Sequence, residues 1–302
     1  MRRIDSATKT SQLGPKRRDP KYNSFISKYS YGSHSNMFIE DFCSSYSIAL
    51  AKHINERNFY NVDGDEKLFK SVFGYDFLRY DLDNLLSNIT ENLMLFGKAY
   101  VERIYIYDKK GDFAGVYYKC INCRKIKSRV KNIAYKIKTD ENLKIKGQIP
   151  KRTIIFFRIK DLGFSKKFFR RKIKKLKRLE LPKPELTFKS YFDIKHFEKK
   201  GDYRLLKITK DVYWTARKYD NTYVTEPYLI YRNMMFEKLR NNFLEYLISK
   251  INEDIDSIKD ETKFTGKIIF DSITQNYDKL ITEFQSGEKN CEQIGKVIFK
   301  GF

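Results

Sequence analysis

The clearest pattern in the chain is a helical stripe that passes directly into a strand alternation. Between Tyr80 and Phe96, apolar side chains recur every three or four residues, which places them on one helix face. They are Leu82, Leu86, Ile89, Leu93 and Phe96. Gly97 follows, where a residue in the left-handed conformation ends a helix at low cost. Residues 98–107 (KAYVERIYIY) then alternate with period two, and a DKKG turn at 108–111 leads into a returning strand, FAGVYYKCI. The pattern predicts a helix–hairpin unit joined at Gly97.

Two other segments have helical spacing. Residues 37–54 carry Phe38, Phe42, Tyr46 and Ala49 on one face. Thr225-Glu226-Pro227 is a typical helix start, with a capping residue, an early acid and a proline. The helix predicted from there runs for about 35 residues, or about 50 Å. Its apolar positions are Leu229, Phe236, Leu239, Phe243, Leu247, Ile251, Ile255 and Ile258. The alternative is two helices with a kink near Asn252.

The remaining segments indicate shorter elements. Strands are predicted at 132–138 and 152–159, and strands or mixed structure at 186–197 and 203–219. From residue 264 the pattern indicates a strand, a helix over 276–287 and a final strand over 294–302. The prediction is an α+β fold: a helix–hairpin core, several short strands and one long helix in the C-terminal half. A length of 302 residues suffices for one large domain or two ordinary ones.

Three regions follow from this pattern. Residues 1–35 are rich in Ser, Gly, Lys and Arg and are predicted to form a basic flexible arm, either solvated or laid on nucleic acid or a neighbouring subunit. Residues 36–224 form a mixed α/β domain that contains a basic helix over 164–180. Residues 225–302 form the long helix followed by strand, helix and strand.

The charge of the chain gives information about its binding partner. Lys and Arg number 61 against 38 Asp and Glu, a formal net charge of +23, which favours a polyanion and above all nucleic acid. An AT-rich coding sequence, which raises lysine everywhere, is the alternative explanation. Nine of the thirteen residues from Lys166 to Arg178 are cationic, and Phe169, Ile173, Leu176 and Leu179 form an apolar stripe among them. This amphipathic helix is suited to phosphates, a membrane surface or a protein partner, or it is only a solvated face. The nucleic-acid-binding candidates are Lys166, Lys167, Arg170, Arg171, Lys174, Lys175 and Arg178.

Catalytic motifs are absent from the sequence. It contains no GxxxxGK[ST], GxSxG, HExxH or GxGxxG, and its three histidines are far apart. A single CxxC, Cys120 to Cys123, lacks the further ligands that zinc needs. The acidic pairs Asp63/Asp65 and Asp81/Asp83 leave a metal-dependent nuclease open as an alternative. We therefore predict no catalytic residue, no metal and no cofactor. No apolar run reaches the length of a membrane helix, and the polar N-terminal segment does not have the pattern of a signal peptide.

Four short motifs occur in an order that resembles a known family. Gly97-Lys98-Ala99-Tyr100, with Gly111 in the hairpin turn, is similar to a G-N/K-A-Y step before a hairpin. The segment from Ile149-Pro150 to Arg158 is similar to a proline-led strand. LGFSKKFF, with Gly163, is similar to a G-x-S step into a helix, and LITEFQSGEKNCEQIGKVIF, with Gly287, to a helix–Gly–strand unit. Together they resemble tailed-bacteriophage portal (head–tail connector) proteins, over roughly residues 37–180 and 264–302.

The resemblance implies a compact or divergent portal, because most portals are longer and less basic. It implies a wing-like domain over 36–224 and a stem-like long helix, in a homo-oligomeric ring, commonly a dodecamer. Double-stranded DNA passes through such rings during packaging and ejection, and capsid proteins, tail proteins and the packaging motor contact them. The expected location is the capsid vertex of the virion, and the host cytoplasm during assembly. The alternatives are a basic nucleic-acid-binding protein of viral or mobile-element origin, or an unrecognised metal-dependent enzyme.

Overall fold

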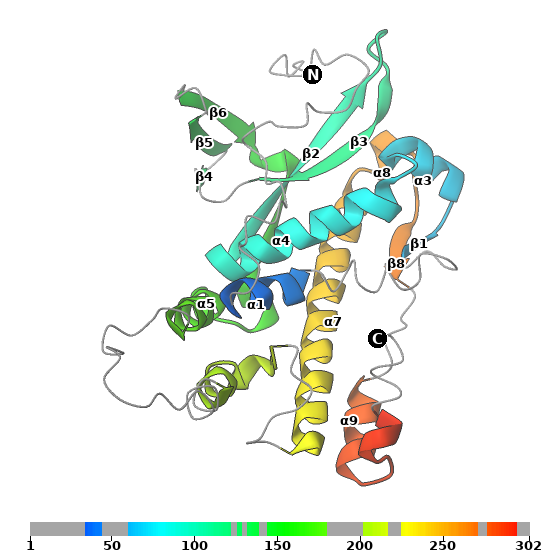
Figure 1. Cartoon of the computed structure of the whole chain (residues 1–302). Helices are drawn as coiled ribbons and strands as arrows, with labels where there is room; N and C mark the ends of the chain where they lie inside the picture. Colours follow the sequence, from blue (N-terminus) through cyan, green and yellow to red (C-terminus); the bar gives the residue numbers. More distant parts are fainter. Residues whose placement is uncertain are drawn as a thin grey trace.

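The structure is a computed structural model with an α+β fold (Figure 1). It describes residues 34–43, 60–121, 126–128, 132–138, 144–179, 202–216, 225–270 and 277–294. The arm up to residue 33, the segment 186–197 and the last predicted strand beyond Ile294 lie outside these residues. So do His53, His196 and Cys123.

The predicted helix–hairpin unit is confirmed. A short π-helical turn, η1 (Phe77–Asp81), leads into α4 (Leu82–Phe96), whose predicted apolar stripe is buried apart from its last residue. Gly97 adopts the left-handed conformation at φ 69° and ψ 13°. Strand β2 (Lys98–Tyr107) begins at the next residue and pairs antiparallel with β3 (Phe113–Cys120).

A third strand, β7 (Ile154–Arg158), pairs antiparallel with the first half of β2 and completes a sheet of order β3-β2-β7. One face of this sheet, which includes Ala99, Val101 and Phe157, enters the main hydrophobic core. On the other face, Tyr100 belongs to a smaller cluster of buried residues with Ile121, Ile133 and Ile149. Because period two sends neighbouring side chains to opposite faces, β2 serves both clusters.

That smaller cluster is shared with a second sheet, formed by β4 (Ile126–Ser128), β5 (Asn132–Lys138) and β6 (Lys144–Pro150). The strand predicted at 132–138 is confirmed as β5. The strand predicted at 152–159 is confirmed over 154–158, but Pro150 does not lead into it directly. Pro150 ends β6, and a 3-10 turn, η3 (Lys151–Thr153), separates the two strands.

Besides α4, the main core includes residues of α1 (His34–Cys43), α5 (Phe168–Leu179) and α7 (Glu226–Ser257). Helix α1 starts before Met37, so His34 and Ser35 belong to a helix and not to the predicted arm. Helix α7 runs unbroken through Asn252, so the alternative of a kink there is wrong. The Asn252 side chain instead bonds the backbone of Ile268, accepting from its N–H and donating to its carbonyl oxygen, both at 2.8 Å.

Part of the C-terminal region returns to the main core. Strand β8 (Lys267–Phe270) pairs antiparallel with β1 (Tyr60–Asp63), and the short helices α8 (Lys259–Thr262) and α3 (Glu66–Phe73) flank this pair. Helix α9 (Tyr277–Gln285) lies along the first half of α7 (Figure 1) and shares a separate apolar cluster with it. The main core therefore draws on both sides of the predicted boundary at residue 224.

The segment predicted as strand or mixed structure from residue 203 is helical at its start. Residues 202–208 form a helix, and the 3-10 turn η5 (Lys210–Val212) follows. Leu205, Leu206 and Thr209 are buried, at the spacing of one helix face, so tertiary packing selects helix here. Within the described residues, no helix is long and apolar enough to cross a membrane.

Candidate nucleic-acid interface

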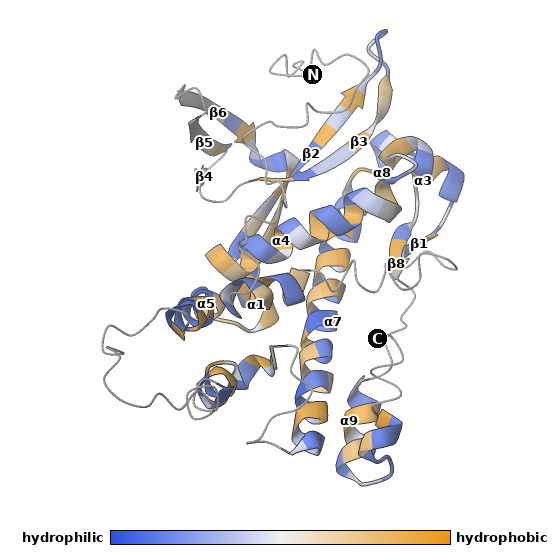
Figure 2. Ribbon diagram, in the orientation of Figure 1, coloured by the Kyte–Doolittle hydropathy of each residue, from blue (hydrophilic) through white to orange (hydrophobic). Residues whose placement is uncertain are grey.

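Helix α5 and the two residues before it present a continuous cationic face to solvent. Every exposed residue between Lys166 and Arg178 is a lysine or an arginine. These are the seven predicted binding residues, Lys166, Lys167, Arg170, Arg171, Lys174, Lys175 and Arg178, together with Lys177. Figure 2 shows the helix as predominantly hydrophilic at one side of the molecule.

The opposite face of α5 is anchored in the core. Phe169 and Leu176 are fully buried, and the Phe169 ring meets Phe42 edge-on at 5.3 Å. The ninth cation, Lys172, points inward: its Nζ donates to Asp211 Oδ2 at 2.7 Å and to the Ile208 carbonyl at 3.0 Å. Lys172 therefore fixes the rotation of the helix, which leaves the other eight cations on the solvent side.

Gly97 packs against the backbone at the start of the basic segment. A Cβ on Gly97 would lie 2.5 Å from the carbonyl oxygen of Lys166, closer than real Cβ atoms come. The Gly97 carbonyl also accepts a hydrogen bond from the Ile159 N–H at 3.1 Å. The joint between α4 and β2 thus touches the backbone that leads into α5, so one glycine serves both the helix end and the interface.

The eight outward cations form no ion pair with another described residue. Like charges three and four positions apart on a helix repel by a few tenths of a kcal/mol per pair. A ligand with closely spaced negative charges removes this repulsion and adds its own attraction, and a nucleic-acid backbone has that spacing.

The other residues of the portal-like motifs have structural positions. Gly97, Gly111, Gly163 and Gly287 all have positive φ, which explains glycine at those points of the order. Ala99 and Tyr100 are buried on opposite faces of β2. None of these side chains lies on the exposed face of α5.

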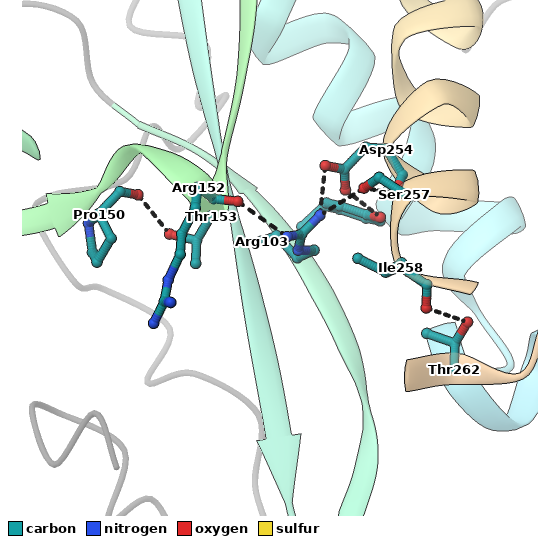
Figure 3. A network of polar contacts seen from close by, with 9 residues as sticks. Arg103, Pro150, Arg152, Thr153, Asp254, Ser257, Ile258 and Thr262 are labelled. Carbon is teal, nitrogen blue, oxygen red and sulfur yellow. Dashed lines mark hydrogen bonds and ion pairs between the residues drawn. The ribbon is translucent and has the colours of Figure 1, made fainter. Parts of the chain in front are cut away.

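A partly buried polar network, not predicted from the sequence, joins the hairpin to the end of α7 (Figure 3). Arg103 Nη1 donates to Asp254 Oδ1 at 2.7 Å, and its Nη2 donates to the Arg152 carbonyl at 3.1 Å. The Tyr118 hydroxyl donates to Asp254 Oδ2 at 2.9 Å. Burial, followed by the Asp254 charge, raises the pKa of Tyr118 well above its ordinary value. One feature of the sequence could have indicated this network: Arg103 lies on the same face of β2 as Ala99, Val101 and Tyr105, where a charged side chain needs a polar partner.

The acidic pairs do not build a metal site. Asp65 caps α3 by accepting from the backbone N–H groups of Lys67 and Leu68, and Asp63 lies 3.6 Å from Lys267 Nζ. Among the described residues, no group of three or more His, Cys, Asp or Glu side chains is placed to hold a metal ion. Cys120, the described half of the CxxC, is buried, and its sulfur accepts a hydrogen bond from Asn92 Nδ2 at 3.3 Å.

Asp83 is a buried carboxyl in the first turn of α4. Burial raises the pKa of Asp83 to about 7, and a hydrogen bond with Tyr60 opposes this rise only in part. Between the unfolded pKa and pH 7, the folded state holds a proton that the unfolded state releases, so stability falls as pH rises through this window.

We expect Asp83→Asn to remove this dependence. The variant should gain roughly 1–3 kcal/mol over the parent protein at pH 8 and little at pH 4. Urea titrations at both pH values measure the difference. A parent-minus-variant difference that does not change with pH would contradict the assignment.

The comparisons with known proteins add no family to this geometry. No protein-family model matches the chain, and no curated protein matches it with significance. The resemblance to portal proteins therefore stays a prediction that rests on its own motifs.

Proposed function

We propose that this chain is a non-catalytic structural protein that contacts nucleic acid without sequence preference, as a subunit of a portal-type ring. The observation that carries the nucleic-acid part is the exposed face of α5, where every solvent-facing side chain from Lys166 to Arg178 is cationic. Phosphate contacts of this kind position a duplex but do not read its bases.

The ring part of the proposal is supported by the order of the motifs and by the length of α7. This helix has 32 residues, about three times the usual helix length, and its first half packs only partly within the main core. Long helices of this kind supply surfaces for packing between subunits. In a ring of identical subunits, the α5 faces repeat by symmetry and offer many phosphate contacts to one DNA. The proposed setting is the capsid vertex, with capsid proteins, tail proteins and a packaging motor as partners.

Charge reversal on α5 tests the interface. We expect the fourfold change of Arg170, Arg171, Lys174 and Lys175 to Glu to lower the affinity for duplex DNA at least about 100-fold at low salt. The slope of log K against log salt should fall by about 4. Fluorescence anisotropy with a labelled duplex, read at several salt concentrations, measures both quantities.

The matched control carries the same charge change elsewhere. It reverses four exposed lysines away from α5, namely Lys109, Lys110, Lys259 and Lys263. An equal loss of affinity in both variants would mean that net charge, and not the α5 face, drives binding. Unchanged binding in the α5 variant would assign that face to solvation or to a protein partner.

Mass measurement separates the ring from the second candidate, a basic nucleic-acid-binding protein of another kind. We expect light scattering after size exclusion to show a closed oligomer, and electron microscopy to show rings. A strict monomer at high protein concentration, together with retained DNA binding, would favour the second candidate.

A further inference from the structure

A row of aromatic and cationic side chains crosses from β2 to β7 beside the joint at Gly97. Tyr100 lies directly opposite Phe156, and Lys98 lies directly opposite Arg158 in the antiparallel register. Since residues two apart share a face, all four side chains lie on the same side of the sheet. This is the face away from the main core, and the function proposed for α5 does not use it.

Phe156 is the exposed aromatic ring of this row. Its side chain is 42% exposed, whereas Tyr100 beneath it is 5% exposed. The two rings are stacked, with centroids 4.9 Å apart and planes 18° apart. A stacked ring held on a buried ring is preorganised, so a further planar group meets it without ordering it first.

Two cations flank the stacked rings. Lys98 Nζ lies 5.1 Å from the Tyr100 centroid and donates to its hydroxyl at 3.1 Å. The Arg158 guanidinium lies 5.9 Å from the Phe156 centroid, and its Nε lies 3.2 Å from Asp161. Like charges directly opposite on paired strands are unfavourable, and the Asp161 carboxylate offsets part of the Arg158 charge. The Arg158 side chain is still 58% exposed despite that pair.

The row adjoins the α5 interface. The Lys166 backbone packs against Gly97, and Lys98 is the next residue along the chain. The start of β2 and the start of the α5 cationic face are therefore neighbours along the backbone contact at Gly97. Cations beside an exposed ring suit a ligand that alternates phosphates with flat aromatic groups, which a purely apolar protein segment does not offer.

From this arrangement we infer that the face around Phe156 binds an unpaired nucleobase of single-stranded nucleic acid. The base stacks on Phe156, and Lys98 and Arg158 contact the phosphates of the same strand. The inference rests on the proposed α5 interface for the neighbouring phosphates. It adds a preference that α5 alone lacks, because a base inside a duplex cannot stack on a protein ring.

Tryptophan fluorescence tests the contact directly. The chain has one tryptophan, Trp214, and it is 1% exposed. We expect Phe156→Trp to add a fluorophore that an oligo(dT) of about 20 nucleotides quenches, while the parent protein shows no quenching. An oligo(U) of equal length, measured in parallel, tells whether the site takes DNA, RNA or both.

Affinity tests the energy of the contact. Phe156→Ala should weaken oligo(dT) binding about 5- to 100-fold and leave binding to a duplex within about twofold. Tyr107→Ala removes another exposed aromatic side chain, at the far end of β2, and should change neither the affinity for oligo(dT) nor that for a duplex. The α5 reversal should weaken both ligands.

The outcomes separate the two proposals. Unchanged oligo(dT) affinity in Phe156→Ala, or no quenching in Phe156→Trp, overturns the stacking site while duplex binding through α5 stands. Duplex binding that survives the α5 reversal overturns the proposed interface, whichever result Phe156 gives.

Discussion

Arg232→Met is expected to lower the free energy of unfolding by about 2–4 kcal/mol. Arg232 lies in α7 and is 1% exposed. Its Nη2 donates to Thr209 Oγ1 at 3.0 Å, to the Thr209 carbonyl at 3.1 Å and to the Trp214 carbonyl at 3.0 Å. Methionine fills much of the volume but donates none of these bonds. The Thr209 carbonyl keeps the Val212 N–H and the Trp214 carbonyl keeps the Thr209 hydroxyl, so the loss is that of three bonds from a charged donor, with the Thr209 hydroxyl oxygen left without a donor.

Urea denaturation followed by far-UV circular dichroism measures this loss. Arg170→Met, on the exposed face of α5, is the control and should change stability by less than about 0.5 kcal/mol. A loss below about 1 kcal/mol at Arg232 would mean that water replaces the guanidinium and that the segment around Trp214 does not depend on it.

Gly97→Ala is expected to cost about 2–4 kcal/mol, from two causes that can be separated. The left-handed backbone alone costs a non-glycine residue about 1 kcal/mol. The added Cβ also clashes with the carbonyl oxygen of Lys166, because an ideal Cβ on residue 97 would lie only 2.5 Å from that oxygen. Because that oxygen belongs to the backbone entering α5, the variant should also weaken duplex binding.

Gly287→Ala is the matched control for this prediction. Gly287 has φ 79°, close to the value at Gly97, but a Cβ there would meet no atom within 4 Å. It should lose only the conformational part, about 1 kcal/mol. Equal losses at the two glycines would show that the close approach of Lys166 relaxes without cost.

Local patterns explain why much of the fold was predictable. The apolar stripe of α4, the left-handed Gly97 and the alternation of β2 each follow from neighbouring residues, and all three are confirmed. The start of α7 was predictable for the same reason, since Thr225 and the following proline are local signals, although the Thr225 side chain makes no capping hydrogen bond.

Non-local packing explains what was missed. The segment beginning at Tyr203 alternates enough to suggest a strand, but burial of Leu205, Leu206 and Thr209 on one side makes residues 202–208 helical. Strand β6 contains two lysines and a glycine, residue types that are uncommon in strands, so its own sequence does not predict a strand. Pairing with β5 makes it one.

In the candidate site, too, local features were predictable and features that depend on distant residues were not. The exposed positions of α5 follow from its apolar stripe, and the seven predicted cations are all on the solvent side. Lys172 lies three positions after Phe169 and four before Leu176, on the buried face of the helix. Its partner, Asp211, could not be predicted, because it lies on a segment far along the chain. The register that places Tyr100 opposite Phe156 is also set by strand pairing and not by either strand alone.

The pairing of β1 with β8 has a consequence for synthesis on the ribosome. Tyr60 pairs with Phe270, so most of the chain must be translated before this two-stranded sheet can form. Until then, the buried aromatic side chains of α3, Phe69 and Phe73, lack the contacts that Phe264 makes with them. Nascent chains that stop before β8 should therefore be protease-sensitive around α3 and in need of chaperones, whereas the α4–β2–β3 hairpin unit, built from local contacts, can form early.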